Sequence, residues 1–147
     1  MEKPIVVKSS DVEKTTTPAF GEEAGWMQRI GYPSDVMPTK GVFLGVCEIN
    51  PGYCVHRWHT HTTDKAEGYE VIYPEGFEEI YYVVSGNATI QWKTSEGKIV
   101  EEQVSAGDVV YCPVGIAEHQ LLNTGKEKMF VVFCGNLPPV VKMKPLN

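Results

Sequence analysis

The sequence predicts an all-β protein that folds as one domain. Fourteen glycines and ten prolines are spread along its 147 residues. Between them lie short runs rich in Val, Ile, Tyr and Phe, such as GVFLGVCEI, EIYYVV, ATIQWK and MFVVFC. Runs of this length and composition between turn residues are typical of strands in a sandwich or barrel, and helical periodicity is nearly absent. A chain of this length with 42% hydrophobic residues is suited to a single domain with its own core.

The two ends of the chain are less regular than its middle. A weak helical turn is expected at Ser10–Glu13, an early strand in GWMQRIGYP and a loop in SDVMPTKG. Tight turns are expected at Pro51-Gly52, Ser85-Gly86, Ser95-Glu96-Gly97 and Ala106-Gly107-Asp108. The tail LPPVVKMKPLN carries three prolines, which suit an edge or a surface wrap rather than a central strand.

Composition excludes several classes of partner. Thirteen Lys and Arg face nineteen Asp and Glu, which gives a net charge of −6, and no basic run is present. Such a chain would repel a phosphate backbone, so no nucleic-acid partner is expected. The apolar runs are only strand-length, so no membrane helix is expected. The N-terminus lacks the apolar core of a secretory signal, and we expect a cytoplasmic protein.

The four cysteines fit that compartment. Each lies alone in an apolar, strand-like segment, and no C-x-x-C spacing occurs. Free buried thiols explain this pattern better than a disulfide framework or a zinc ribbon. The residues concerned are Cys47, Cys54, Cys112 and Cys134.

The histidines suggest a metal site. His59 and His61 are two apart, so on a strand their side chains point to the same face. His119 lies where a turn leads into another apolar strand, and Glu78 and Glu79 begin the run EEIYYVV. A His-x-His pair alone favours metal and a structural role equally, and acidic pairs usually face water. The joint pattern, together with the surrounding glycines and prolines, carries more weight than any one residue.

In that joint pattern the sequence resembles the cupin family, whose members are double-stranded β-helix (jelly-roll) barrels. Two family motifs are matched in order, the second with Pro-x-Gly before its histidine. The matching residues are Gly52, His59, His61, Glu79 and Gly86, then Gly107, Pro113, Gly115, His119 and Asn123. The resemblance implies an N-terminal arm with the first strand or strands in residues 1–40, a cupin barrel in 41–135 and a tail in 136–147.

The chain departs from the family pattern chiefly by an insert at residues 62–78. Seventeen residues separate His61 from Glu79, where three or four are usual. The insert is either a hairpin that covers the barrel mouth as a lid or an inert surface hairpin. Glu79 is preferred as the ligand because its spacing to Gly86 matches the family. The rival glutamates are Glu67, Glu70, Glu75 and Glu78.

By this resemblance, His59, His61, Glu79 and His119 bind one divalent ion. Fe(II) or Mn(II) suits an octahedral site that keeps two positions open, and Zn(II) or Ni(II) is also compatible with these ligands. The open positions would take water, dioxygen or a bidentate substrate.

Two further residues are candidates for catalysis. If the strand is regular, Arg57 shares the face of His59 and could bind a substrate carboxylate, although it could equally lie at the solvent end. Tyr81 would point inward after Glu79, either as a hydrogen-bond donor or acid or as a structural tyrosine. His56 is a weaker candidate for a general base.

The function expected is that of a metal-dependent enzyme acting on a small oxygen-rich or carboxylated molecule. Its reaction would be that of a non-haem dioxygenase or of a metal-assisted isomerase, lyase or decarboxylase, because one cupin site hosts all of these. The alternative is a non-catalytic carrier or sensor that binds a small molecule. We also expect a homodimer in which strands from Gly25 onward and the tail extend a partner's sheet.

Overall fold

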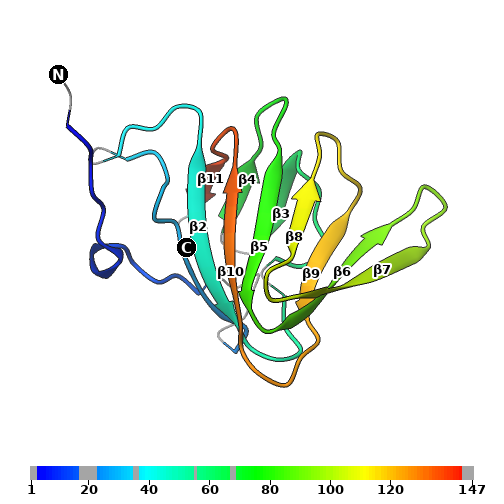
Figure 1. Cartoon of the computed structure of the whole chain (residues 1–147). Coiled ribbons are helices and arrows are strands. Elements are labelled where there is room, and N and C mark those ends of the chain that lie inside the picture. The colour runs from blue at the N-terminus through cyan, green and yellow to red at the C-terminus, as the bar shows by residue number, and fades with distance from the viewer. Residues whose placement is uncertain (1–2, 17–22, 35–36, 55, 67–68, 144–147) are drawn as a thin grey trace.

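Antiparallel strands dominate the fold, as predicted (Figure 1). The computed structural model describes residues 3–16, 23–34, 37–54, 56–66 and 69–143. Within these ranges the chain forms eleven strands and one short 3-10 helix, η1 (Ser9–Asp11), and none of its helices is long and apolar enough to span a membrane. The helix lies where a weak turn was expected.

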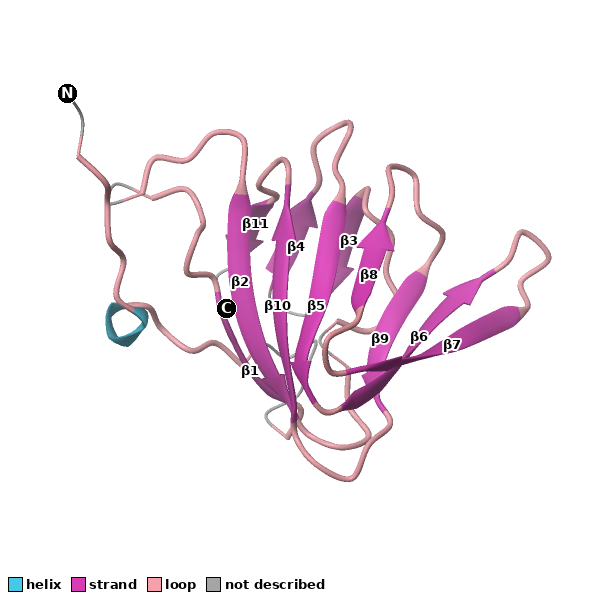
Figure 2. Cartoon of the chain, in the orientation of Figure 1, coloured by secondary structure: helices cyan, strands magenta, loops and turns pink. Residues whose placement is uncertain are grey.

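One five-stranded sheet forms the front layer in Figure 2. Neighbouring strands are antiparallel, and the order is β1 (Gly25–Gln28), β2 (Phe43–Ile49), β10 (Met129–Gly135), β5 (Glu79–Ser85) and β8 (Val109–Cys112). In β5, Glu79, Tyr81 and Val83 are buried, whereas Ile80 and Tyr82 are exposed. This alternation turns the polar start of β5 toward the interior.

A three-stranded sheet faces this layer across the core. Its order is β7 (Ile99–Ser105), β6 (Asn87–Lys93) and β9 (His119–Asn123). The segment before the insert runs beside β9 through two isolated bridges, Cys54↔Leu122 and His59↔His119. These bridges bring the first histidine motif against the second.

The insert and the C-terminal tail form a sheet of their own. The hairpin β3 (Thr63–Ala66) and β4 (Tyr69–Ile72) pairs with β11 (Val140–Met143), and β11 is an edge strand of this sheet. At the other end of the chain, β1 pairs with β2. Both segments expected to extend a partner's sheet therefore pair within the same chain.

Glycine at a turn between β5 and β6 is required by the backbone. Gly86 has a φ of 94°, and a Cβ there would lie 2.9 Å from the Met129 Cα. Only glycine tolerates both conditions, so the predicted Ser85-Gly86 turn also fixes how closely β10 approaches. The core beyond it is apolar, with Met129, Val83 and Val131 fully buried.

Candidate metal centre

Three histidines from two segments meet inside the barrel. One ring nitrogen each of His59, His61 and His119 lies within 4.8 Å of the other two. Their exposed fractions are 4%, 8% and 0%. Reciprocal backbone hydrogen bonds of 3.1 and 3.0 Å join His59 to His119 and hold these two residues side by side. Such a buried group of imidazoles is suited to a transition-metal ion.

Backbone carbonyls orient two of the rings. The Nδ1 of His59 lies 2.9 Å from the Arg57 carbonyl oxygen, and that of His119 lies 2.9 Å from the Ala117 carbonyl oxygen. A carbonyl only accepts, so each Nδ1 carries the proton and donates it. In both rings Nε2 therefore keeps its lone pair, which is the tautomer that binds a metal through Nε2.

The third ring lacks a hydrogen-bond partner. Within the described residues, neither Nδ1 nor Nε2 of His61 makes a hydrogen bond, although both atoms are buried. Nε2 lies 3.3 Å from Oε2 of Glu79 but without the alignment of a hydrogen bond. Leaving a buried polar atom unsatisfied costs about 1–3 kcal/mol, and an ion bound at Nε2 would remove one such penalty. The donor set therefore fits a divalent metal ion.

Aromatic residues from the insert hold the His61 ring in place. Tyr73 stacks on it with ring centroids 5.1 Å apart, and Phe77 meets it edge-on at 4.8 Å. The insert thus packs against one of the three histidines, in contrast to an inert surface hairpin.

Glu79 is the glutamate that lies against these histidines. It is buried at the start of β5, whereas its neighbour Glu78 accepts a hydrogen bond from the Tyr111 hydroxyl. Of the other rival glutamates, Glu75 is exposed and Glu70 is half-buried on β4. Glu67 lies outside the described residues.

Burial keeps His59 and His119 neutral. Burial and the neighbouring imidazoles lower the pKa of His59 well below its ordinary value of 6.5. Burial, reinforced by His61, lowers the pKa of His119 to about 4. Both rings are therefore unprotonated at neutral pH and can act as ligands without first losing a proton.

Tyr81 lies beside the histidines as a protonated hydroxyl. It is buried and hydrogen-bonded to Glu79, and burial together with the charge of Glu79 raises its pKa well above 10. Burial also raises the pKa of the Cys112 thiol, whose Sγ lies 3.8 Å from Nε2 of His119. The Tyr81 phenol is thus a hydrogen-bond donor at any physiological pH.

Arg57 lies outside this group. Its side chain is exposed, and its backbone carbonyl rather than its guanidinium contacts His59. The residues just before His59 are not part of a continuous strand, so the alternation assumed for Arg57 does not hold there. His56 stacks on His59 with ring centroids 3.9 Å apart and pairs with Asp64 at 2.5 Å.

A small cavity of about 50 Å³ adjoins the cluster. His59, Glu79 and Tyr81 form one side, and Val71 and Val141 bring the insert and the tail to it. The sequence interpretation did not anticipate two of its polar lining residues, Arg29 and Tyr32. The spacing of Met27 and Arg29 was one indication in the sequence that Arg29 faces the interior. Residues two apart on a strand point to the same face, and Met27 also lines the cavity. A wider cleft of about 660 Å³ reaches His119 from the side of β6, β7 and β8.

A jelly-roll barrel with a buried three-histidine cluster defines the class of fold and site, and comparison with known proteins shows which proteins share this fold. The Cupin_2 family model, a cupin domain, matches residues 74–135, which is less than half of the chain. The match includes Glu79 and His119 but begins at residue 74, after the first histidine motif. A search of curated protein sequences gives no significant match.

Three solved structures illustrate the likeness. A variant of Bacillus subtilis oxalate decarboxylase has 15% identity and a TM-score of 0.66, over 93% of this chain and 31% of that one. Lactobacillus farciminis oxalate decarboxylase, in complex with formate, has 22% identity and a TM-score of 0.62, over 91% and 34%. A putative sugar phosphate isomerase from Acidithiobacillus ferrooxidans has 18% identity and a TM-score of 0.62, over 95% and 80%.

The resemblance to the cupins is thereby confirmed: the chain has the cupin fold, and its residues 74–135 match the cupin domain model. It spans about a third of the length of the two oxalate decarboxylase chains. At these identities the likeness establishes the fold alone, so the activity has to be argued from the site.

Proposed function

We propose that the protein is a metal-dependent enzyme that acts on a small carboxylated molecule. The observation that carries this proposal is His61, whose buried ring nitrogens lack hydrogen-bond partners among the described residues and which lies beside two histidines with unprotonated Nε2 atoms. The ligands are His59, His61, Glu79 and His119.

Mn(II) or Fe(II) is the ion proposed, with Zn(II) or Ni(II) as the alternatives. Three neutral imidazoles and one carboxylate suit any of these ions. A related structure of the Bacillus subtilis decarboxylase is described as containing Mn(II) centres, which supports testing manganese first. When bound, such an ion supplies Lewis-acid polarisation of a substrate oxygen and, for iron or manganese, redox chemistry.

The chain itself contributes orientation, a proton and exclusion of water. Tyr81 holds its proton at the hydroxyl and donates a hydrogen bond next to Glu79. Met27, Val71 and Phe133 give the cavity an apolar wall, which strengthens electrostatic interactions inside it. This arrangement serves an isomerase, lyase or decarboxylase and a dioxygenase equally, and Arg57 remains a predicted substrate contact.

The insert hairpin is proposed as a lid. Val71 of β4 and Val141 of β11 line the cavity, and Tyr73 and Phe77 pack against His61. Movement of this sheet would open the cavity and loosen the His61 ring at the same time. A lid of this kind admits substrate and then excludes water.

Turnover assays test the proposed activity. Protein loaded with Mn(II) or Fe(II) is incubated with oxalate, glycolate and other small hydroxy acids, and with sugar phosphates, while carbon dioxide, dioxygen and isomeric products are followed. The proposal requires turnover that stops when the metal is removed by a chelator. Ligand binding without any product at every metal tested would instead support the carrier or sensor.

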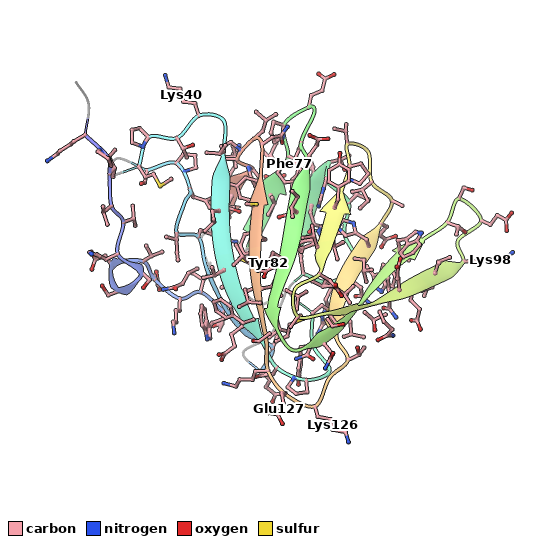
Figure 3. The ribbon with its side chains drawn as sticks, viewed as in Figure 1. Lys40, Phe77, Tyr82, Lys98, Lys126 and Glu127 are labelled. Atoms are coloured by element: carbon pink, nitrogen blue, oxygen red, sulfur yellow. The ribbon has the colours of Figure 1, made fainter. Side chains whose placement is uncertain are left out.

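A homodimer and a cytoplasmic location complete the proposal. The outer face of the five-stranded sheet exposes apolar side chains, among them Tyr82, which projects from the front layer in Figure 3. Its neighbours on this face are Ile80, Val84, Val109 and Tyr111. Contiguous exposed apolar area of this kind favours a self-complementary interface. Light scattering should give twice the chain mass, and the free cysteines fit a reducing compartment.

A further inference from the structure

Arg29 is placed by the sheet on the cavity beside the histidines. It follows β1, whose last pair is Gln28↔Val46, and precedes the hydrogen bonds that join Gly31 to Leu44 at 2.7 and 3.3 Å. Backbone pairing on both sides therefore fixes its position. Its side chain lines the same cavity as His59 and Glu79.

The guanidinium of Arg29 has donors to spare. Nη1 lies 3.4 Å from the Thr15 hydroxyl, and the group sits 5.9 Å from the ring centroid of Tyr32. Among the described residues, no carboxylate lies within 4.0 Å of Arg29. A guanidinium carries five N–H donors, and these contacts use only a few of them. A half-buried cation without an acidic partner is ready for an anionic ligand.

The charge balance of the cavity also favours an anion. Among the described residues that line it, Glu79 is the only carboxylate. In the proposed site the divalent ion outweighs that single negative charge, and Arg29 adds a second positive one. A cavity with this charge attracts a small carboxylate, which a guanidinium binds with two parallel hydrogen bonds.

The volume of the cavity limits the size of the ligand that it can hold. One water molecule needs roughly 10–15 Å³ of such space, and the cavity offers about 50 Å³. There is thus room for a few water molecules or for a carboxylate with a few heavy atoms. Arg57, by contrast, is exposed and does not line this cavity.

We propose that Arg29 binds the carboxylate of a small substrate in the cavity whose metal-binding face includes His59 and Glu79. This assignment rests on the proposed function, because the ion supplies the excess positive charge on that face. Arg29 is then the specificity-determining residue for acids over their neutral analogues.

Calorimetric titration tests the assignment, with glycolate and its neutral analogue glycolamide as probes. Wild-type protein loaded with Mn(II) should bind glycolate at least tenfold more tightly than glycolamide. Arg29→Gln should weaken glycolate binding by about tenfold to a hundredfold and leave glycolamide within twofold, which is the loss of one charge-assisted bidentate contact. Arg29→Lys should recover part of the lost affinity, because lysine keeps the positive charge but cannot make the two parallel hydrogen bonds of a guanidinium.

Two comparison variants make the result specific. Lys98→Gln removes a positive charge at the tip of the β6–β7 hairpin, where Figure 3 labels Lys98, and should change neither affinity because Lys98 does not line the cavity. Arg57→Gln measures the rival arginine. Unchanged glycolate binding in Arg29→Gln, or a larger loss in Arg57→Gln, would overturn the assignment, provided that thermal unfolding shows the variants to be folded.

Metal content separates this inference from the proposed function. If wild-type protein takes up no metal, the proposed function fails, and the same titrations are made on metal-free protein. Glycolate binding that depends on Arg29 would then still support the anion site. Absence of glycolate binding to wild-type protein in both forms would overturn it.

Discussion

The two ends of the barrel interior differ in chemistry although the same strands build both. β5 turns Glu79 and Tyr81 inward at its start and Val83 near its end, and β9 likewise passes from His119 to Leu121. In the strand pairing, Val83 lies opposite Val131 in β10, and Glu79 lies opposite Cys112 in β8. The apolar end therefore stabilises the fold, and the histidine end carries the proposed chemistry.

This division teaches why a polar cluster can persist in so small a core. The apolar end supplies burial worth about 1.5–3 kcal/mol for each large side chain. The histidine end contributes buried ring nitrogens without hydrogen-bond partners, and these groups stabilise the fold only when an ion binds. Substitutions at the two ends should therefore separate folding from metal binding.

The largest expected effect is at the histidine end. His59→Ala removes one ligand and should weaken metal binding by more than about a hundredfold, since changes to residues behind the ligands alone cost ten- to a hundredfold. The far-ultraviolet circular dichroism should stay that of the wild type. Competition with a chromophoric chelator measures the affinity, and full metal stoichiometry in this variant would refute the ligand assignment.

The opposite pattern is expected at the apolar end. Met129→Ala opens a cavity at a fully buried position and should lower the free energy of unfolding by about 2–5 kcal/mol. Metal stoichiometry at low temperature should stay at the wild-type value. Urea unfolding with and without metal measures both quantities, and loss of metal affinity together with stability would argue against two separable ends.

Acid should weaken the metal-free protein through the histidine end. His119 has an ordinary pKa of 6.5 when unfolded and about 4 when folded, so between these values the unfolded chain binds more protons. Stability is therefore complete above pH 6.5 and falls as the pH drops toward 4, by up to about 3 kcal/mol. Urea titrations in a chelator at pH 7 and pH 5 measure this, and equal stability at both would contradict it.

Substitution of the two adjacent glutamates, Glu78 and Glu79, should have smaller and unequal effects on metal affinity. Glu79→Gln should lower metal affinity by about tenfold to a hundredfold, because the buried carboxylate beside His61 becomes a neutral amide. Glu78→Gln serves as the matched control, since Glu78 bonds to Tyr111 instead. Equal affinities in the two variants would show that Glu79 is not a ligand.

Local pattern was enough to predict much of this molecule. The alternation in EIYYVVS determines which side chains of β5 turn inward, and the glycine turns fix where strands end. The three histidines were predicted as a group from their spacing within strands and from the family motifs. These features depend on residues near one another in sequence or on a pattern that the family shares.

The rest depends on pairing between distant segments. Nothing local in the tail indicates that Val140 pairs with Ile72 of the insert. Arg29 reaches the cavity only because β1 adds to the edge of β2, and Arg57 turns away because its segment lacks a regular ladder partner. Such contacts are set by the register of the whole sheet, so the sequence alone did not indicate that Arg29 lines the cavity.

The central claim is that this barrel holds one divalent ion through its buried histidines. Mass spectrometry of the metal content tests it most directly, on protein purified without added metal or affinity tag and again after reconstitution with each ion. One equivalent per chain, lost in His59→Ala and retained in Met129→Ala, is the predicted result. Absence of bound metal after reconstitution with manganese, iron, zinc and nickel would contradict the claim.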